Sequence, residues 1–168
     1  MLIDLNDPVA VEVVVSFVQR KKKIGESSGL TSGCFDLIHY HHLTFFTRCR
    51  RFCDHLFVGI DSDELVREAK GENRPLIYDW RRAAMVDALK PVSFTFIINS
   101  VTDFGRAAQI IHPNVIFKGE DFLGKEDTVV GREFAEKLMI IRDLADHMST
   151  TAIMEEAARQ VHAARGVR

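Results

Sequence analysis

The sequence predicts an α/β protein in which helices flank one parallel sheet of five strands. Strand-like apolar runs recur along the chain, and the segments between them are long enough to form helices. The run HLFVGI, residues 55–60, is apolar throughout after its first residue, which is typical of a strand covered on both faces. With 168 residues, we expect one domain spanning 1–168, with an N-terminal helix and lead-in at 1–28 and the core at 29–168.

The first strand is the weakest of the five. Residues 29–32 are poor in β-branched side chains, so this strand is inferred mainly from the turn that follows it. Three of the others are short, mainly apolar runs, and the last, at 139–144, is strand-like. We expect strands at residues 29–32, 55–60, 94–98, 114–117 and 139–144.

Capping residues and prolines delimit the helices between these strands. Asp7 and Pro8 give the first helix an N-cap and a first-turn proline, and Pro91 stops a helix before the third strand. We expect Asp103 to cap the next helix and the cluster 149–151 to cap the last one. We expect helices at residues 8–23, 40–52, 63–69, 80–89, 103–112, 132–137 and 152–164.

Composition and charge exclude several classes of protein. Hydrophobic residues make up 46% of the chain and charged residues 27%, which is a globular composition rather than a disordered or fibrous one. The formal net charge is −2, so no overall positive field attracts nucleic acid or an anionic membrane. Any affinity for phosphate groups must therefore be local.

The N-terminus and the cysteines bear on the compartment. The first residues lack the pattern of a signal peptide, and no run approaches the roughly 18 apolar residues of a membrane span, so we expect a cytoplasmic protein. Cys34, Cys49 and Cys53 are an odd number, which argues against a disulfide framework. Cys49 and Cys53 could hold a metal with His55, but free cysteines are more often small buried residues, and we favour that interpretation.

One stretch, GLTSGCFDLIHYHHLTFF at residues 29–46, combines a strand end, a tight turn and the start of a helix. Gly33 can adopt dihedral angles that are closed to other residues. The free amide N–H groups at the start of the next helix attract anions. His39 and His42, three positions apart, fall on one face of the first helical turn. The stretch therefore predicts a phosphate-binding junction.

Polar motifs follow four of the five predicted strands. GCFD follows the first strand, Asp61 to Asp63 the second, Lys118 the fourth and MSTT the fifth. Parallel sheets bind ligands outside the carboxyl ends of their strands. We therefore expect these motifs to form one site.

The motifs resemble those of a known family. GCFDLIHYHH, residues 33–42, is similar to the first motif of the cytidylyltransferase-like nucleotidyltransferases, G-[TCV]-F-D followed by H-x-G-H. MSTTAI, residues 148–153, is similar to their second motif, in which S-T-T opens the last helix. KGENRP at 70–75, FKGED at 117–121 and VVG at 129–131 resemble the adenylyltransferase domain of bacterial heptose-phosphate enzymes. The resemblance implies a Rossmann-like fold.

Two further positions resemble the same branch of the family. Asp146 stands three residues before Ser149, and Leu144 is apolar. Glycerol-phosphate and ethanolamine-phosphate cytidylyltransferases usually carry an arginine at the position of Leu144. The resemblance therefore favours a sugar phosphate such as heptose 1-phosphate as the acceptor and ATP as the nucleotide, with CTP possible.

The resemblance also implies a reaction and roles for residues. A phosphate oxygen of a small phosphorylated substrate would attack the α-phosphorus of a nucleoside triphosphate and displace pyrophosphate. The catalytic residues would be His39 and His42, which donate hydrogen bonds, and Lys118 and Arg82, which offset negative charge. The residues that bind the nucleotide and its phosphates would be Gly33, Cys34, Phe35, Asp36, Lys70, Arg74, Ser149, Thr150 and Thr151.

Cofactor and partners follow from the same resemblance. Mg²⁺ would accompany the triphosphate and be held by no protein ligands, because it prefers phosphates and water to a protein cage. The partners would be a nucleoside triphosphate and a small phosphorylated substrate, with no nucleic acid and no membrane. Relatives of this size commonly form homodimers, and we expect one here.

Other interpretations remain open. HYHH could suggest a metal site, although no matched ligand set accompanies it. Ser149 to Thr151 would cap a helix in any protein, and Arg74 and Arg82 could be ordinary surface charges. His41 and His147 stand where the family has glycine. The alternatives to the enzyme above are a glycerol-phosphate-type cytidylyltransferase and a catalytically degenerate module that binds a nucleotide or metabolite.

Overall fold

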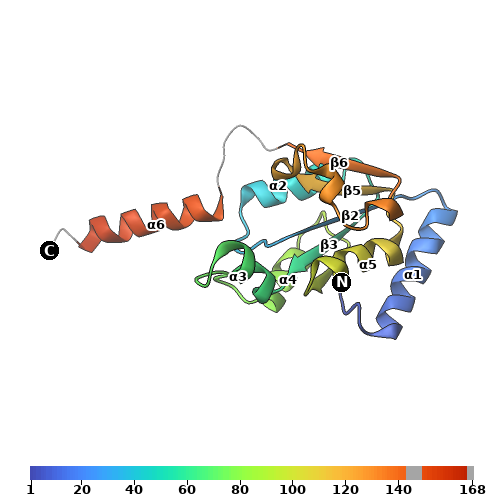
Figure 1. Cartoon of the computed structure of the whole chain (residues 1–168), viewed down its shortest axis with the longest axis horizontal. Coiled ribbons are helices and arrows are strands. Elements are labelled where there is room, and N and C mark those ends of the chain that lie inside the picture. Colours follow the sequence, from blue (N-terminus) through green and yellow to red (C-terminus); the bar gives the residue numbers. More distant parts are fainter. Residues whose placement is uncertain (143–148, 166–168) are drawn as a thin grey trace.

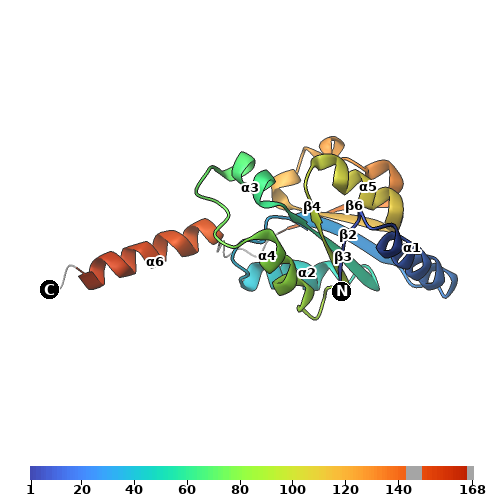
Figure 2. The ribbon, with the colours of Figure 1, turned by 90° about the horizontal axis from the view of Figure 1, so that it is seen from below.

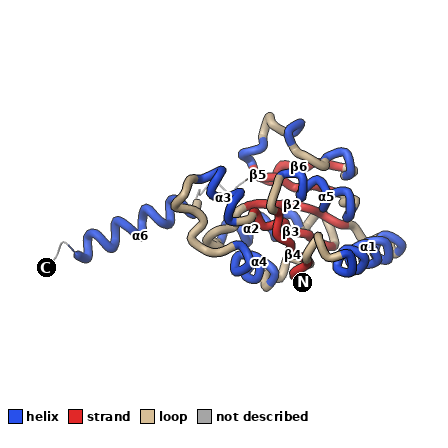
Figure 3. Tube along the Cα trace, turned by 60° about the horizontal axis from the view of Figure 1, so that its bottom comes forward, coloured by secondary structure: helices blue, strands red, loops and turns tan. Residues whose placement is uncertain are grey.

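A sheet of six parallel strands forms the centre of the computed structural model, which describes residues 1–142 and 149–165 (Figure 1). The strand order is β1-β4-β3-β2-β5-β6, and every neighbouring pair is parallel. Figure 3 shows the strands in one layer between helices. The strands are β1 (Leu2–Ile3), β2 (Ser28–Gly33), β3 (His55–Asp61), β4 (Phe94–Ile98), β5 (Val115–Gly119) and β6 (Lys137–Ile141).

The α/β class and the parallel sheet are as predicted, but the predicted number of five strands is wrong. The additional strand, β1, pairs with β4 through Leu2 and Ile3. Two residues are too short to produce an apolar pattern that distinguishes a strand from a loop. The strand predicted at 139–144 is β6, which begins and ends earlier, and Leu144 lies outside the described residues, as do Asp146 and His147.

Helices cover both faces of the sheet. Figure 2 shows α2 and α4 on one side and α5 on the other. The helices are α1 (Pro8–Lys23), α2 (Tyr40–Cys49), α3 (Asp63–Lys70), α4 (Asp79–Asp87), α5 (Val101–Ile111) and α6 (Thr150–Arg165). Three short 3-10 helices follow β5: η1 (Glu120–Phe122), η2 (Glu126–Thr128) and η3 (Arg132–Phe134).

Local capping chemistry explains where the helices begin. The predicted Asp7 cap is confirmed, because its carboxylate accepts a hydrogen bond from the amide of Val9 at 2.9 Å. The predicted Asp103 cap is wrong. Ser100 is the N-cap of α5, and Asp103 is the reciprocal partner in a capping box. The helix predicted at 132–137 is only the 3-10 turn η3, because Lys137 already pairs with β5.

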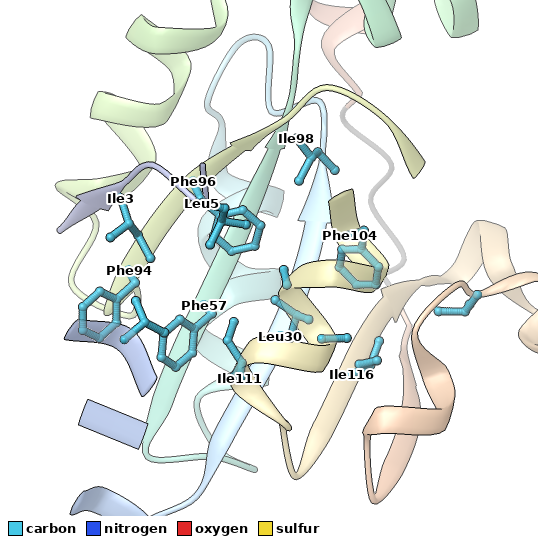
Figure 4. Packing of buried hydrophobic residues seen from close by; sticks show 14 residues of the cluster. Ile3, Leu5, Leu30, Phe57, Phe94, Phe96, Ile98, Phe104, Ile111 and Ile116 are labelled. Atoms are coloured by element: carbon cyan, nitrogen blue, oxygen red, sulfur yellow. The ribbon is translucent and has the colours of Figure 1, made fainter. Parts of the chain in front are cut away.

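Two apolar clusters hold the layers together. The first lies between the sheet and α1 and α5, around Phe57 and Phe96 (Figure 4). The second lies under α2 and α4 and includes Cys49 and Cys53, with Cys53 Sγ 3.5 Å from the Cys49 carbonyl oxygen. Burial raises the pKa of both thiols, that of Cys53 to about 11. The interpretation of these cysteines as buried apolar residues is confirmed, since all three in the chain are free and buried.

The loop after β5 packs closely on α5. Gly131 has a φ of +82°, and a Cβ there would lie 2.8 Å from the Gly105 Cα and 2.8 Å from the Ala108 Cβ. Only a residue without a side chain tolerates both the left-handed backbone and this close approach. The segment VVG therefore fixes the loop against the helix that covers the sheet.

The helix α6 extends away from the rest of the molecule in two perpendicular views (Figures 1 and 2). Its first residue, Thr150, is buried, whereas most of its length is exposed. Within the described parts of the chain, no helix has the length and apolar character needed to cross a membrane.

Candidate active site

The GCFD turn leaves the sheet at the carboxyl end of β2. Gly33 is the last residue of the strand, and Phe35 has a left-handed backbone with a φ of 47°. This conformation is uncommon for an aromatic residue and requires compensation from packing. The Phe35 ring provides it, because its centroid lies 4.9 Å from that of Phe46 and 5.3 Å from that of His42.

Asp36 points inward and holds a distant loop. Its side chain is completely buried and accepts a hydrogen bond from Arg74 Nε at 2.8 Å. The amides of Leu76 and Ile77 donate to the same carboxylate at 2.9 and 3.0 Å. These three donors fix the loop 71–78 to the first motif. The oxygen atoms of Asp36 therefore accept hydrogen bonds from the protein's own groups.

Arg74 connects that loop to α6. Its Nη1 atom lies 3.7 Å from the sulfur of Met154 in α6. Its Nη2 atom is buried and has no hydrogen-bond partner among the described residues. A buried guanidinium nitrogen without an acceptor is unfavourable unless a ligand supplies one. Arg74 thus has one donor left for an anion.

The two motif histidines stack at the start of α2. The ring centroids of His39 and His42 are 3.8 Å apart with an interplanar angle of 23°, and His41 lies edge-on to His39 at 5.9 Å. Burial lowers the pKa of His42 to about 3, assisted by the charge of His39, while the Leu37 backbone acts in the opposite direction. His42 is therefore neutral at pH 7, so it can donate a hydrogen bond but supplies no positive charge.

Arg82 is a fixed cation under the GCFD turn. It is 1% exposed in α4, and its Nη1 donates to the carbonyl oxygen of Cys34. Its Nη2 pairs with Asp63 at 2.8 Å, and its Nε donates to the Ile77 carbonyl at 2.8 Å. All three nitrogens are engaged, so Arg82 acts on the site through its charge and its hold on the turn.

Lys118 is a second buried cation, near the carboxyl end of β5. The side chain is enclosed, with the residue 8% exposed, and Nζ donates to Ser32 Oγ at 3.0 Å. The ammonium also lies over the rings of Phe104 and Phe122, at 4.2 and 4.8 Å from their centroids. Burial lowers the pKa of Lys118, and Asp61 and Asp121 oppose that shift.

Asp61 belongs to the strand-end motif expected at the site, but its residue type alone indicated no role for it. This residue ends β3 and is partly buried beside the site. Burial raises the pKa of its carboxyl group, while the charges of Lys118, Arg82 and Lys70 lower it. Its signal in the sequence was its place directly after a buried strand, which is the same signal that identified Lys118.

The remaining predicted residues lie around this edge. Lys70 is exposed at the end of α3, and its charge acts on Cys34, His42 and Asp61. Ser149 Oγ accepts a hydrogen bond from the amide of Ala152 at 3.1 Å and so caps α6. Thr150 is buried and Thr151 is exposed. The connection from α6 to the first motif runs through Met154 and Arg74 rather than through these hydroxyl groups.

Together these elements gather hydrogen-bond donors and buried cations at the carboxyl end of β2. The His39–His42 pair, Arg82 and Lys118 come from α2, α4 and β5, and all lie near the carboxyl end of β2. Fixed donors and buried cations of this type bind phosphate groups and stabilise developing negative charge.

A comparison with protein families decides the relationship. The model of the cytidylyltransferase-like family matches residues 30–156. The chain belongs to this family. The match begins within β2 and covers both motifs and strands β3 to β6, and it identifies the chain as one of the cytidylyltransferase-like nucleotidyltransferases.

Curated relatives of this cytidylyltransferase-like chain carry the name bifunctional protein HldE. The protein from Campylobacter fetus is 36% identical over 137 residues, which cover 82% of this chain and 29% of that protein. The protein from Sulfurimonas denitrificans is 33% identical over 151 residues, 90% of this chain and 31% of that protein. This chain therefore spans about three tenths of the length of these relatives.

Solved structures share the fold at low sequence identity. The lipopolysaccharide core biosynthesis protein from Thermoplasma volcanium has a TM-score of 0.59 and 20% identity, covering 73% of this chain and 100% of that chain. Pantothenate synthetase from Thermus thermophilus has a TM-score of 0.52 and 13% identity, covering 81% of this chain and 61% of that chain. At these identities the likeness concerns the fold alone.

Proposed function

We propose that this chain moves a nucleoside monophosphate group from a nucleoside triphosphate to a sugar phosphate and releases pyrophosphate. ATP is the favoured donor, with CTP as the alternative, and heptose 1-phosphate is the favoured acceptor. The similarity to HldE proteins and the segments KGENRP and FKGED support this choice. The observation that carries the proposal is the convergence of the stacked histidines with Arg82 and Lys118 at one edge of the sheet.

The reaction is a single displacement at phosphorus. A phosphate oxygen of the acceptor bonds to the α-phosphorus, the bond from that phosphorus to the bridging oxygen breaks, and the electron pair leaves with pyrophosphate. No covalent bond to the protein forms. Mg²⁺ enters as part of the substrate, bound to triphosphate oxygens and water. The protein contributes position and fixed charge.

Each part of the site has a role in this reaction. His39 and His42 donate hydrogen bonds to the triphosphate, and because His42 is neutral the positive charge comes from Lys118 and Arg82. The amides of the GCFD turn and the N-terminus of α6 hold phosphate groups. Asp36 holds the loop that carries Arg74, and the free Nη2 of Arg74 donates a hydrogen bond to an anionic oxygen of the substrate.

Pyrophosphate release tests the proposal. The assay combines Mg²⁺ and either ATP or CTP with a panel of sugar and polyol phosphates, heptose 1-phosphate included. We expect turnover with ATP and a sugar phosphate. Lys118→Met should lower kcat by about 10² to 10³, whereas Lys125→Met, an exposed lysine in the same loop region, should leave it unchanged.

One structural feature favours a second candidate function. His41 fills a position on the first turn of α2, edge-on to His39, where the family pattern has glycine. A chain that binds nucleotide but turns over no substrate pair in the panel would be a binding module, and the enzyme proposal would be lost. Isothermal titration calorimetry with each nucleotide measures the binding.

We also expect the chain to form a homodimer. Light scattering, which measures the molar mass in solution, tests this expectation.

A further inference from the structure

Asp61 and Lys118 lie on the same face of the sheet, on strands that flank β2. Phe57, Leu30 and Ile116 all belong to the apolar cluster beneath α5. Side chains two positions apart on a strand share a face, so Asp61, Ser32 and Lys118 also point to the α5 side. The hydrogen bond from Lys118 Nζ to Ser32 Oγ at 3.0 Å agrees with this placement.

The surroundings of Lys118 do not by themselves favour an ammonium ion. Its hydrogen-bond acceptor is the neutral hydroxyl of Ser32, and the two phenylalanine rings that attract the ammonium also shield it from water. Removing a cation from water favours the neutral amine unless negative charge lies nearby. A lysine that keeps its proton in the empty site attracts a phosphate without first having to take up a proton.

Two carboxylates face Lys118 from the elements packed around it. Asp61 comes from the end of β3, and Asp121 comes from η1. Asp121 is exposed, whereas Asp61 is partly buried. Water and salt screen an exposed charge more strongly than a buried one, so Asp61 is the more effective partner.

We propose that Asp61 is a positioning residue that keeps Lys118 protonated in the substrate-free protein. It acts through Lys118 and across the end of β2, without a direct ion pair. The other cations that face Asp61 are Arg82 and Lys70. Arg82 already has Asp63 as its own carboxylate partner at 2.8 Å. Lys70 is exposed, which leaves Lys118 as the buried cation that depends on Asp61.

The catalytic consequence rests on the proposed function, but the coupling of the two charges does not. If Lys118 offsets charge in the reaction, losing its proton removes that effect. The alkaline limb of the pH profile of kcat/KM should then move to lower pH in Asp61→Asn. In the same assay Asp61→Glu, which restores the charge, should return the limb toward its original position.

Nuclear magnetic resonance of the Lys118 Nζ and Cε atoms tests the coupling without any substrate. A pH titration gives the pKa of Lys118 in the wild-type protein, in Asp61→Asn and in Asp121→Asn. We expect Asp61→Asn to lower that pKa by at least about 1 unit, a tenfold change in the protonation ratio. Asp121→Asn, the matched control, should lower it by less than half as much. An unchanged pKa in Asp61→Asn, or equal shifts in both variants, would overturn the proposal.

A reciprocal measurement keeps the test valid if Asp61→Asn does not fold. Charge coupling acts equally on both partners, so removing the ammonium should raise the pKa of Asp61. The carboxyl carbon of Asp61 reports this pKa in Lys118→Met. A rise of about 1 unit supports the pair, and no rise contradicts it. Because neither titration needs turnover, failure of the activity panel would not be mistaken for failure of this inference.

Discussion

The imidazole rings of His39 and His42 are stacked, with their centroids 3.8 Å apart and their planes 23° apart. Two imidazoles at this separation do not both accept a proton easily, because two positive charges would then lie in contact. The arrangement therefore disfavours a second positive charge on the pair, and places two hydrogen-bond donors at the start of a helix, where the free amides already attract an anion.

Removing one of these donors should affect the chemical step. We expect His39→Ala to lower kcat by about 10² to 10³, the size of the loss when one transition-state hydrogen bond is removed. Steady-state kinetics with the substrate pair found in the panel measures it. His162→Ala, at an exposed position on α6, is the control. An unchanged kcat in His39→Ala would remove His39 from the mechanism.

The low pKa of His42 predicts how stability depends on pH. The ordinary pKa of histidine is 6.5 and that of His42 in the folded protein is about 3, so between these values the unfolded chain binds more protons. Stability therefore falls as pH decreases through this range, by at most about 1.4 kcal/mol per pH unit for one group. We expect His42→Gln to show a weaker decline than the wild-type protein in urea unfolding below about pH 6.5. Equal declines would show that His42 does not titrate in this way, and His162→Gln is the control.

The buried pair of Asp36 and Arg74 predicts a large loss of stability when one partner is removed. Asp36→Asn should lower the free energy of unfolding by about 3 kcal/mol, because it leaves a buried guanidinium without its countercharge. A double-mutant cycle with Arg74→Gln should give a coupling energy of about 1 to 3 kcal/mol. Glu156→Gln, in the exposed pair with Arg159, should have little effect. A coupling energy near zero would contradict the geometry.

The close approach of Gly131 to α5 predicts a difference between two glycines. Gly131 and Gly124 both have positive φ angles, +82° and +76°, but a Cβ at Gly124 would meet nothing within 4 Å. Alanine at Gly124 should cost about 1 kcal/mol from backbone strain alone. Alanine at Gly131 should cost a further 1 to 3 kcal/mol, roughly, from crowding. Chemical denaturation of both variants isolates the packing contribution, and equal losses would refute it.

Local signals made much of the sheet predictable. The runs HLFVGI and those at 94–98 and 114–117 are mostly apolar, so each appears as a buried strand within a residue or two of its actual bounds. β1 was missed because two residues carry no periodicity. The cap of α5 was assigned to Asp103 although S-V-T-D is itself the signature of a capping box with serine first.

The sequence indicated which residues gather at the candidate site, but not the directions of their side chains. Strand-end positions pointed to Lys118 and the GCFD turn, and the structure brings them to one edge. Asp36 turns inward to bind Arg74 and the amides of Leu76 and Ile77. These partners lie 38 to 41 residues further along the chain, so no local pattern around Asp36 indicates them. Spacing along the chain reports which elements meet, but long-range hydrogen bonds depend on packing that no local pattern encodes.

The first turn of α5 belongs to both the core and the site. Phe104 is 4% exposed in the apolar cluster, and the same ring forms one wall around the Lys118 ammonium. The next residue, Gly105, lies so close to Gly131 that a side chain at position 131 would collide with it. Substitutions that displace this turn should therefore change thermal stability and ligand affinity in parallel. Selection for a more stable chain at these positions would at the same time change the surroundings of the Lys118 ammonium, and with them the affinity for phosphate groups.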